Sequence, residues 1–378
     1  MSALAGHPAK IAGWGSVRMR VPRFTVVLAL VVGTFGLLAF QIEARAQAWS
    51  NGYSYRRTVT IDHTKVPNTN QTNFPVLFSG TYSDLATTSN GGAVTNSNGY
   101  DIIFTSDAAG ANVLPFEREN YNGATGAVNF WVQIPTLSHT TDTTIYLFYG
   151  NSSVTTDQSN QHGTWDINYK GVWHLPNGTS LSGSDSTSNA VNGTNSGMTA
   201  TAGLIDGAAS GDGGNGHQIN TGNNPYASST FSSNGLTLSA WVNPVSNSGT
   251  KQIVSLEGAY VIDINGGKAG FEINGSGTDL VSTASVPTST WTYIVGTSDS
   301  SGNLKLYVNG ASSGTSSQSF YNLDSLNRPY SIGGHPTLSG YNFNGIIDEV
   351  KISNVARGLD RHRVQQPEFT GHVLQRER

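Results

Sequence analysis

The clearest alternation of apolar and polar positions lies between Trp291 and Gly310. Residues 291–296 alternate with the period of two that is typical of a β-strand. Residues 298–303 are turn formers, and Gly302 can take the positive φ that a tight turn needs. Residues 304–308 alternate again and end at the turn pair Asn309-Gly310. The pattern predicts a β-hairpin with one apolar face, which needs a second layer to cover it.

Two further segments have the length and apolar content of strands. Leu236 to Pro244 places Leu236, Leu238 and Ala240 on one face and ends at a proline, which breaks a strand. Phe343 to Ile352 is the second segment. After residue 48 the chain consists of short apolar runs between clusters of Gly, Asn, Ser and Thr, with no long helical period. The sequence therefore predicts an all-β protein.

The order of motifs from about residue 171 to residue 357 resembles a laminin G-like, concanavalin A-like domain. The motifs are V-W-H-L, D-S-T-S-N, L-T-L-S-A-W-V, the hairpin of residues 291–310, and F-N-G-I-I-D-E-V-K-I-S. The resemblance implies a C-terminal jelly roll over residues 163–357. It implies much less about function, because this fold occurs in lectins, glycosidases and adhesion modules.

A separate small β domain, sandwich-like, is expected over residues 49–151. It holds five runs of strand length, at residues 53–61, 73–80, 100–107, 128–135 and 143–150. Motifs such as W-S-N-G-Y-S-Y-R-R-T-V-T-I and T-T-I-Y-L-F-Y-G-N resemble a bacterial domain-of-unknown-function family that commonly precedes laminin G-like modules in exported proteins. Residues 152–162 are polar and aperiodic, which predicts a linker. The charged segment Pro115–Glu119 is interpreted as a solvated strand end.

The N-terminus has the pattern of an export signal. Residues 24–40 are nearly all apolar, three arginines precede them, and Ala46-Gln47-Ala48 follows. This order predicts a secretory signal peptide over residues 1–48, with residues 1–18 as a start-site extension before Met19. The alternative is a retained membrane anchor, since seventeen apolar residues approach the length of a span.

The C-terminus departs from the family pattern after Arg357. Codons can be chosen for the residues from Gly358 onward that restore the family's sequence when they are read one base later. We therefore predict that residues 358–378 are an aberrant, frameshifted tail with no partner in the fold.

Composition excludes several classes of function. The chain has no cysteine, so neither disulfides nor thiolate metal sites are available. Residues 49–356 hold 10 Lys and Arg against 20 Asp and Glu. A body this acidic repels nucleic acid and anionic membrane surfaces. We expect no nucleic-acid partner, and membrane contact only through an uncleaved signal segment.

The carboxylates do not form a recognisable hydrolase motif. A glycosidase needs two carboxylates that face each other across a cleft. The E-x-D-x-x-E run of concanavalin A-like hydrolases does not occur here, and neither G-x-S-x-G nor H-E-x-x-H is present. Asp348 and Glu349 are adjacent, which predicts that they point to opposite faces of a strand. The sequence favours a protein without catalytic activity.

The resemblance also implies a metal site. In many relatives the aspartates equivalent to Asp185 and Asp348 contribute to a bound calcium, and carboxylate, amide and backbone oxygens are the ligands that calcium prefers. The alternative is that Asp185 and Asn189 stabilise their turn through hydrogen bonds to the backbone. Calcium is thus the one cofactor expected.

Sugar-binding sites use exposed aromatic faces beside polar groups. Trp173, Trp241 and Trp291 lie within apolar strand patterns, so they are expected to pack in the core. The better ligand candidates lie beside the hairpin core or before the last strand, and they are Lys305, Tyr307, Asn309, Tyr341 and Phe343.

Our leading hypothesis is an exported protein, secreted, periplasmic or on the cell surface, that binds an extracellular glycan without catalysis. The glycan would lie on the concave sheet face or on the loop rim near the calcium candidates. One alternative is an adhesion or structural module that contacts a surface protein, and the other is a glycoside hydrolase.

Overall fold

The computed structural model describes residues 49, 51–66, 68–176, 181–222, 226, 229–256, 260–275, 280–321, 329–358 and 372–377. These residues belong to one compact unit, Ala46–Arg378. Strands dominate this unit, which confirms the predicted all-β class. The short helices are η1 His63–Lys65, η2 Ser83–Leu85, η3 Thr88–Asn90, α1 Gln161–Thr164 and α2 Ser229–Ser232. The predicted signal peptide lies outside the described residues, and no described helix has the length and apolarity needed to cross a membrane.

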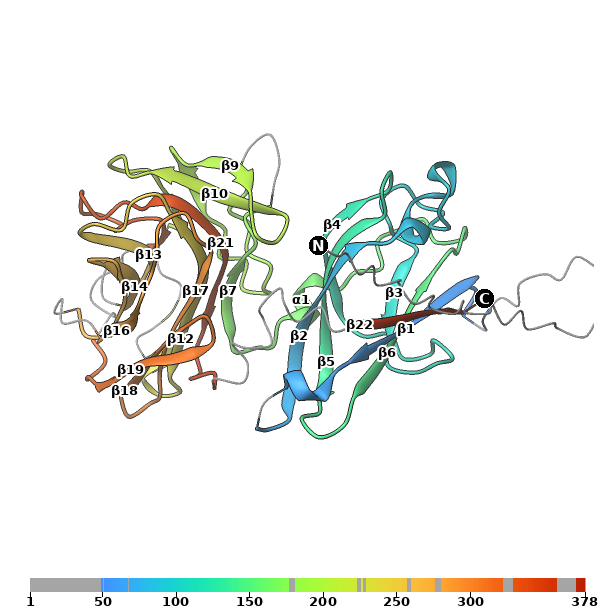
Figure 1. Ribbon diagram of the computed structural model, residues 1–378, viewed down its shortest axis with the longest axis horizontal. Coiled ribbons are helices and arrows are strands. Elements are labelled where there is room, and N and C mark those ends of the chain that lie inside the picture. The colour runs from blue at the N-terminus through green and yellow to red at the C-terminus, as the bar shows by residue number, and fades with distance from the viewer. Residues whose placement is uncertain are drawn as a thin grey trace, which may run out of the picture. The chain divides into compact units, whose positions relative to one another are not determined.

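The N-terminal domain contains two antiparallel sheets with one core between them (Figure 1). The strand order is β22-β1-β6-β3 in one sheet and β2-β5-β4 in the other. Phenylalanines of both sheets meet in the core, where the ring of Phe104 lies 5.5 Å from that of Phe130 and 5.6 Å from that of Phe116. The strands are β1 Tyr55–Ile61, β2 Gln71–Thr81, β3 Ile102–Thr105, β4 Phe116–Asn122, β5 Ala127–Leu137, β6 Thr143–Tyr149 and β22 His372–Glu377.

Strand β22 lies in the tail, residues 358–378, for which the sequence analysis predicts no partner in the fold. Its six residues pair antiparallel with β1, from Ile61 opposite His372 to Arg56 opposite Glu377. The outer edge of β1 offers backbone N–H and C=O groups that almost any extended segment can satisfy. The expectation of a tail without a partner is therefore wrong for His372–Glu377. The frameshift itself stays a prediction, and residues 359–371 and 378 lie outside the described residues.

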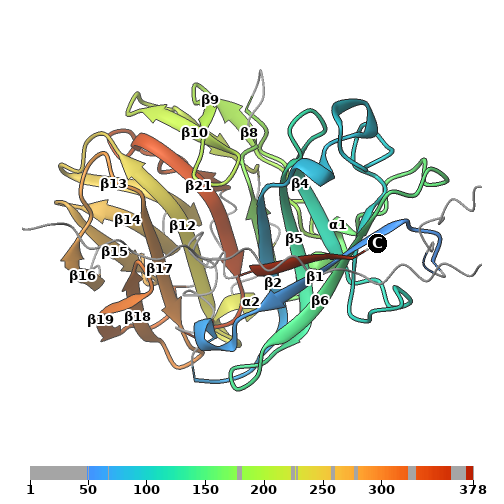
Figure 2. The same ribbon diagram turned by 45° about the vertical axis from the view of Figure 1, so that its right-hand side comes forward.

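The C-terminal domain is a jelly roll of two packed sheets, as predicted (Figures 1 and 2). One sheet has the order β19-β18-β17-β12-β21-β10-β9, with β7 also paired to β21, and the other has the order β16-β15-β14-β13-β20-β11-β8. The strands are β7 Tyr169–Trp173, β8 Thr194–Ser196, β9 Thr199–Ala202, β10 Gly207–Asp212, β11 Gln218–Asn220, β12 Leu236–Pro244, β13 Thr250–Leu256, β14 Tyr260–Asn265, β15 Lys268–Glu272, β16 Leu280–Ser285, β17 Thr292–Ser298, β18 Asn303–Val308, β19 Ala311–Ser317, β20 Tyr330–Ile332 and β21 Asn344–Ser353.

The predicted hairpin is present as β17 and β18, and Asn309 and Gly310 turn the chain into β19 with φ of 49° and 70°. Positive φ at both central residues is the geometry that Asn-Gly favours in a hairpin turn. Its core face holds Ile294 together with the leucines of β18. The expectation of a single apolar face is wrong, however, because Tyr293 and Tyr307 on the other face are buried in a second cluster with Trp241.

Candidate functional site

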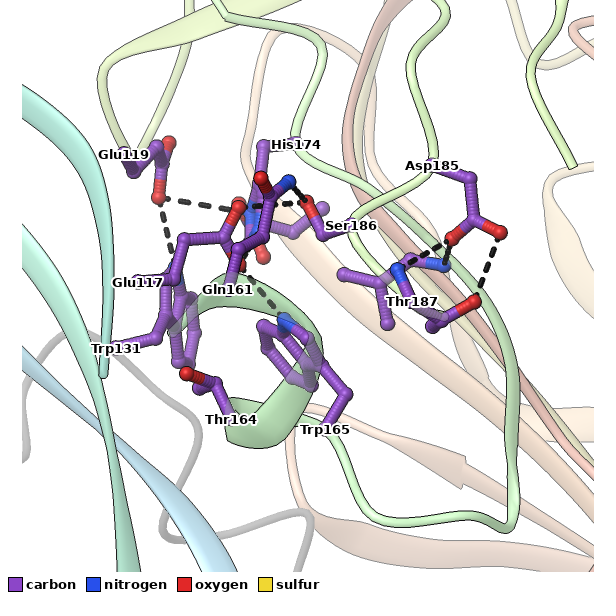
Figure 3. Close-up of polar contacts among 12 residues, drawn as sticks. Glu117, Glu119, Trp131, Gln161, Thr164, Trp165, His174, Asp185, Ser186 and Thr187 are labelled. Atoms are coloured by element: carbon purple, nitrogen blue, oxygen red, sulfur yellow. Dashed lines mark hydrogen bonds and ion pairs between the residues drawn. The ribbon is translucent and has the colours of Figure 1, made fainter. Parts of the chain in front are cut away.

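A cluster of charged side chains is buried where β4 of the N-terminal domain contacts β7 and β21 of the jelly roll (Figure 3). We call it the interdomain cluster, and it consists of Glu117, Glu119, His174, Glu349 and Lys351. Two tryptophans, Trp131 and Trp165, pack against it. Charged groups that leave water need partners in the protein, so each contact in this cluster matters for stability and chemistry.

A β-bulge in β21 gives the cluster its Glu349. Lys351 lies opposite Ser239 of β12 and Asp348 lies opposite Trp241, so β21 carries one extra residue between these pairs. Ile347 and Val350 both pack in the jelly-roll core, which leaves Asp348 and Glu349 facing away from it together. The prediction that these adjacent carboxylates point to opposite faces is therefore wrong, because the bulge breaks the period of two.

A second bulge lies in β4. Arg118 is opposite Phe130 and Asn120 is opposite Asn129, so Glu119 is the extra residue. Glu117 is 5% exposed and the Glu119 side chain is 1% exposed. The interpretation of Pro115–Glu119 as a solvated strand end is wrong, because the face of β4 that carries both glutamates is covered by residues of the jelly roll. The E-R-E spacing, which places two carboxylates on one strand face, was the available signal.

His174 occupies the centre of the cluster. Its Nδ1 lies 2.6 Å from Glu349 Oε1 and 3.5 Å from Glu119 Oε2, and its Nε2 lies 3.2 Å from Glu117 Oε2. Lys351 Nζ donates to Glu349 Oε2 at 2.6 Å. The two glutamates of β4 also accept hydrogen bonds from indole N–H groups: Trp131 donates to Glu119 and Trp165 donates to Glu117, both at 2.7 Å.

Burial and charge act in opposite directions on these groups. Burial raises the pKa of Glu119 well above its usual range. Burial alone would lower the pKa of His174, but the three glutamates outweigh it and raise that pKa. Burial would likewise raise the pKa of Glu349, but His174 and Lys351 hold it at about 2. The cluster therefore holds an ionised Glu349 between two cations, with Glu119 favouring its neutral form.

Asp185, one of the two calcium candidates, has no oxygen lone pair left for an ion. Its Oδ1 accepts hydrogen bonds from the N–H groups of Val172 and Thr187, and its Oδ2 accepts from the Thr187 hydroxyl and the Val191 N–H. Figure 3 shows Asp185 beside Thr187. These four bonds fill the four acceptor sites of a carboxylate. The residues present do not fit a calcium ion here, and they match the alternative of a loop held by a buried aspartate.

Asp348, the second candidate, is also bound to backbone. Its Oδ2 accepts from the N–H groups of Leu204 and Ile205 at 2.8 and 3.0 Å. Among the described residues, neither aspartate belongs to a group of three or more His, Asp or Glu side chains close enough to share an ion. The structure places Asp185 and Asp348 in separate backbone-binding roles.

We expect Asp185→Asn to lower the free energy of unfolding by about 1–3 kcal/mol. The side-chain NH2 of asparagine is itself a donor, and it would face the N–H groups from which the carboxylate now accepts hydrogen bonds. Urea unfolding followed by tryptophan fluorescence measures this loss. Calcium added to metal-free protein should leave the melting temperature of the unaltered chain unchanged. A calcium-dependent rise of several degrees that disappears in Asp185→Asn would instead restore the calcium site.

The sequence-predicted ligand residues do not form one surface. Phe343 is fully buried in the jelly-roll core, and Tyr307 is 5% exposed. Asn309 accepts a hydrogen bond from the Tyr293 N–H and holds its turn. Lys305 is exposed on β18, whereas Tyr341 is partly buried near His335, and its carbonyl accepts a hydrogen bond from the Gln252 N–H of β13. Phe343 and Tyr307 are corrected to packing residues, since neither ring offers a face to a ligand.

A polar cleft of about 550 Å³ lies beside the interdomain cluster. Its walls come from the start of β2, from β5, from α1 and the loop after it, and from residues 355–358 after β21. Its polar lining side chains are those of Gln71, Thr72, Asn73, Gln133, Asp166, Asn168 and Arg357, and Trp165 lines it as well. Sequence reasoning missed this cleft because its residues come from four segments far apart in the chain.

The backbone at two asparagines of this cleft, Asn73 and Asn168, has a defined local conformation. Asn73 has a φ of 46°, which Asn adopts more readily than most residues. Asn168 follows Asp166, whose carboxylate accepts from the Asn168 N–H at 2.9 Å. Arg357 pairs with Asp166 through both of its terminal nitrogens and lies 3.8 Å from the Tyr169 ring centre. The cleft thus combines amides with a fixed guanidinium–carboxylate pair.

Two family models match the chain. Residues 98–170 match a domain of unknown function, DUF2341, and residues 212–361 match the concanavalin A-like lectin/glucanases superfamily, Laminin_G_3. The predicted arrangement, a domain-of-unknown-function module followed by a laminin G-like module, is confirmed. No curated protein matches the chain.

Several solved structures are similar to part of the chain. Domain 4 of AbnA, an extracellular arabinanase of Geobacillus stearothermophilus solved with arabinotriose, shares 19% identity at a TM-score of 0.42, covering 53% of this chain and 98% of that one. The binding domain of Paraclostridial Mosquitocidal Protein 1 shares 16% identity at a TM-score of 0.42, covering 52% and 51%. The binding domain of Botulinum Neurotoxin DC, solved with SialylT, shares 13% identity at 0.40, covering 54% and 52%. The chain thus spans about half the length of the two toxin domains.

Proposed function

We propose that this protein is an exported, non-catalytic carbohydrate-binding protein whose glycan site is the polar cleft. The observation that carries the proposal is the lining of the polar cleft, where most side chains carry amide, hydroxyl, carboxylate or guanidinium groups that can bind sugar hydroxyls. The family description of residues 212–361, which covers lectins and glucanases, supports the class of ligand. The predicted signal peptide supports an extracellular location.

The cleft chemistry suits a sugar chain. Each sugar hydroxyl both donates and accepts hydrogen bonds, and an amide offers a carbonyl acceptor and two donors in one plane. Within the part of the chain that the structure describes, the Asn73 and Asn168 side-chain amides have no hydrogen bond to protein. Both are therefore free to bind hydroxyls, while two hydrogen bonds fix Arg357 against Asp166.

A binding role without catalysis follows from the placement of the carboxylates. Glycoside hydrolysis needs two carboxyl groups on either side of the scissile bond. Asp166 is the acidic residue that lines the cleft, and its carboxylate is engaged by Arg357. The closely spaced glutamates of the interdomain cluster are buried under Trp131 and Trp165, out of reach of a polymer.

We expect the purified full chain to be retained on some polysaccharides of a glycan array, and the double variant Asn73→Ala/Asn168→Ala to bind at least about tenfold more weakly. Two lost hydrogen bonds of about 1 kcal/mol each account for that factor. The matched control is Lys305→Ala/Tyr341→Ala, which removes an exposed and a partly buried candidate outside the cleft and should bind as the unaltered chain does.

Other outcomes would redirect the proposal. No retention on any glycan, together with capture of a surface protein, favours the adhesion alternative. Loss of binding in the Lys305→Ala/Tyr341→Ala control alone moves the site away from the cleft. Release of reducing ends from a retained polysaccharide would show a hydrolase.

A further inference from the structure

We propose that the interdomain cluster binds one divalent transition-metal cation, such as zinc, through Glu119, His174 and Glu349, and that this ion clamps the N-terminal domain to the jelly roll. This inference is independent of the glycan site. One ligand comes from β4, one follows β7, and one lies on β21. The ion would therefore join segments that are far apart in sequence and belong to both domains.

The three side chains already lie at metal-binding spacing. One donor atom from each lies within 4.8 Å of the other two. In a zinc site with Zn–N and Zn–O bonds of about 2.0–2.2 Å, neighbouring donors are separated by about 3.4 Å. The 3.5 Å between His174 Nδ1 and Glu119 Oε2 meets this value, whereas the 2.6 Å between Nδ1 and Glu349 Oε1 must widen.

A buried oxygen without a hydrogen-bond partner is a second observation in favour of a metal ion in this cluster. Glu119 Oε1 has no hydrogen-bond partner among the described residues, although the side chain is 1% exposed. An unpaired buried carboxylate oxygen is costly, and a cation is the partner that removes the cost. With both Glu119 oxygens bound, the ion would have four protein donors, which is the usual number for a structural zinc.

The groups behind the ligands are arranged as in known metal sites. Glu117 is hydrogen-bonded to His174 Nε2, the ring nitrogen that would not bind the ion. A carboxylate in this position orients a metal-binding imidazole. Trp131 holds Glu119 and Lys351 holds Glu349. Zinc bound to His174 Nδ1 and to both Glu119 oxygens displaces the proton on Nδ1 and the proton of the neutral Glu119 carboxyl, and both protons go to solvent.

The charges of the cluster leave room for a cation. Glu117, Glu119 and Glu349 place three carboxyl groups against two basic side chains, His174 and Lys351, so a divalent ion that displaces two protons leaves the net charge of the cluster unchanged. A second group, Asp62, His63 and Asp142, has similar donors but is solvated, and its acids already bind local N–H groups. This group supplies a matched control.

The test is zinc titration of metal-free full chain by calorimetry, with metal content and melting temperature measured on the same samples. We expect one tightly bound zinc, a rise of several degrees in melting temperature, proton release, and at least tenfold weaker binding of calcium. Glu119→Gln and His174→Gln should each weaken this binding at least tenfold, whereas His63→Ala should leave it unchanged.

Two results would overturn the proposal. The first is absence of zinc binding by the unaltered chain. The second is binding that survives both cluster variants or is lost in His63→Ala, which would assign zinc to the exposed group. If the cluster variants do not fold, X-ray absorption of the zinc-loaded His63→Ala chain decides, because that chain lacks the imidazole of the exposed group: one imidazole nitrogen with carboxylate oxygens supports the site, and any other ligand shell refutes it.

Discussion

Replacing Asp84 by asparagine should lower the free energy of unfolding by about 3 kcal/mol, because it leaves Arg57, whose side chain is only 13% exposed, without its counter-charge. Asp84 is 8% exposed and lies in η2, under β1 and β6. Arg57 of β1 donates to it through Nε at 2.9 Å and through a terminal nitrogen, and the Tyr149 hydroxyl of β6 also donates to it. The change thus breaks a network that ties the loop after β2 to two strands of the facing sheet.

The same network predicts how stability depends on pH. Burial acts to raise the pKa of Asp84, but the hydrogen bonds from Arg57 and Tyr149 outweigh it and lower that pKa below its usual range. A lowered folded-state pKa contributes stability above the unfolded value, about 3.9, and loses it as pH falls toward the folded value. The difference in free energy of unfolding between the unaltered chain and Asp84→Asn should therefore become smaller below about pH 4.

Asp157→Asn is the matched control for this prediction. Asp157 pairs with Arg118 on the surface, and its side chain is 41% exposed. Exposed pairs contribute less than about 1 kcal/mol, because water solvates both charges once the pair is lost. Guanidinium unfolding curves of both variants at pH 7 and pH 3.5 measure the difference. Equal losses in the two variants would mean that the Asp84 network is no stronger than a surface pair.

Phe343→Ala should destabilise the protein by about 3–5 kcal/mol, the range for truncating a buried aromatic side chain. The ring is fully buried between the two sheets of the jelly roll, so its removal leaves a cavity and loses apolar burial. Tyr341→Ala, two residues earlier, should cost less than about 1 kcal/mol, because Tyr341 is only partly buried in a loop. Urea midpoints of the two variants give the comparison.

This pair also tests the corrected role of Phe343. A core residue should affect glycan binding only through folding, so Phe343→Ala should keep its affinity at temperatures where it is still folded. A variant that is as stable as the unaltered chain but no longer binds sugar would show that Phe343 contacts the ligand after all.

The sequence by itself determined the core face of β18 and where the hairpin turns. Leu304, Leu306 and Val308 alternate with polar neighbours, and all three pack between the sheets. Asn309-Gly310 forms the turn that its two residue types favour. These features depend on the period of two and on local backbone preferences, both of which are written in consecutive residues.

The tertiary structure alone decided the outer face of that sheet and the sites. The bulges at Glu119 and Glu349 each shift the register by one residue and turn both carboxylates toward His174. A shift of one residue reverses which face a strand presents, and no local pattern marks it. Burial of Glu117 requires contact with the jelly roll, and the polar cleft gathers residues as distant as Asn73 and Arg357. Contacts between segments so far apart follow from the packing of the two domains, which sequence periodicity does not encode.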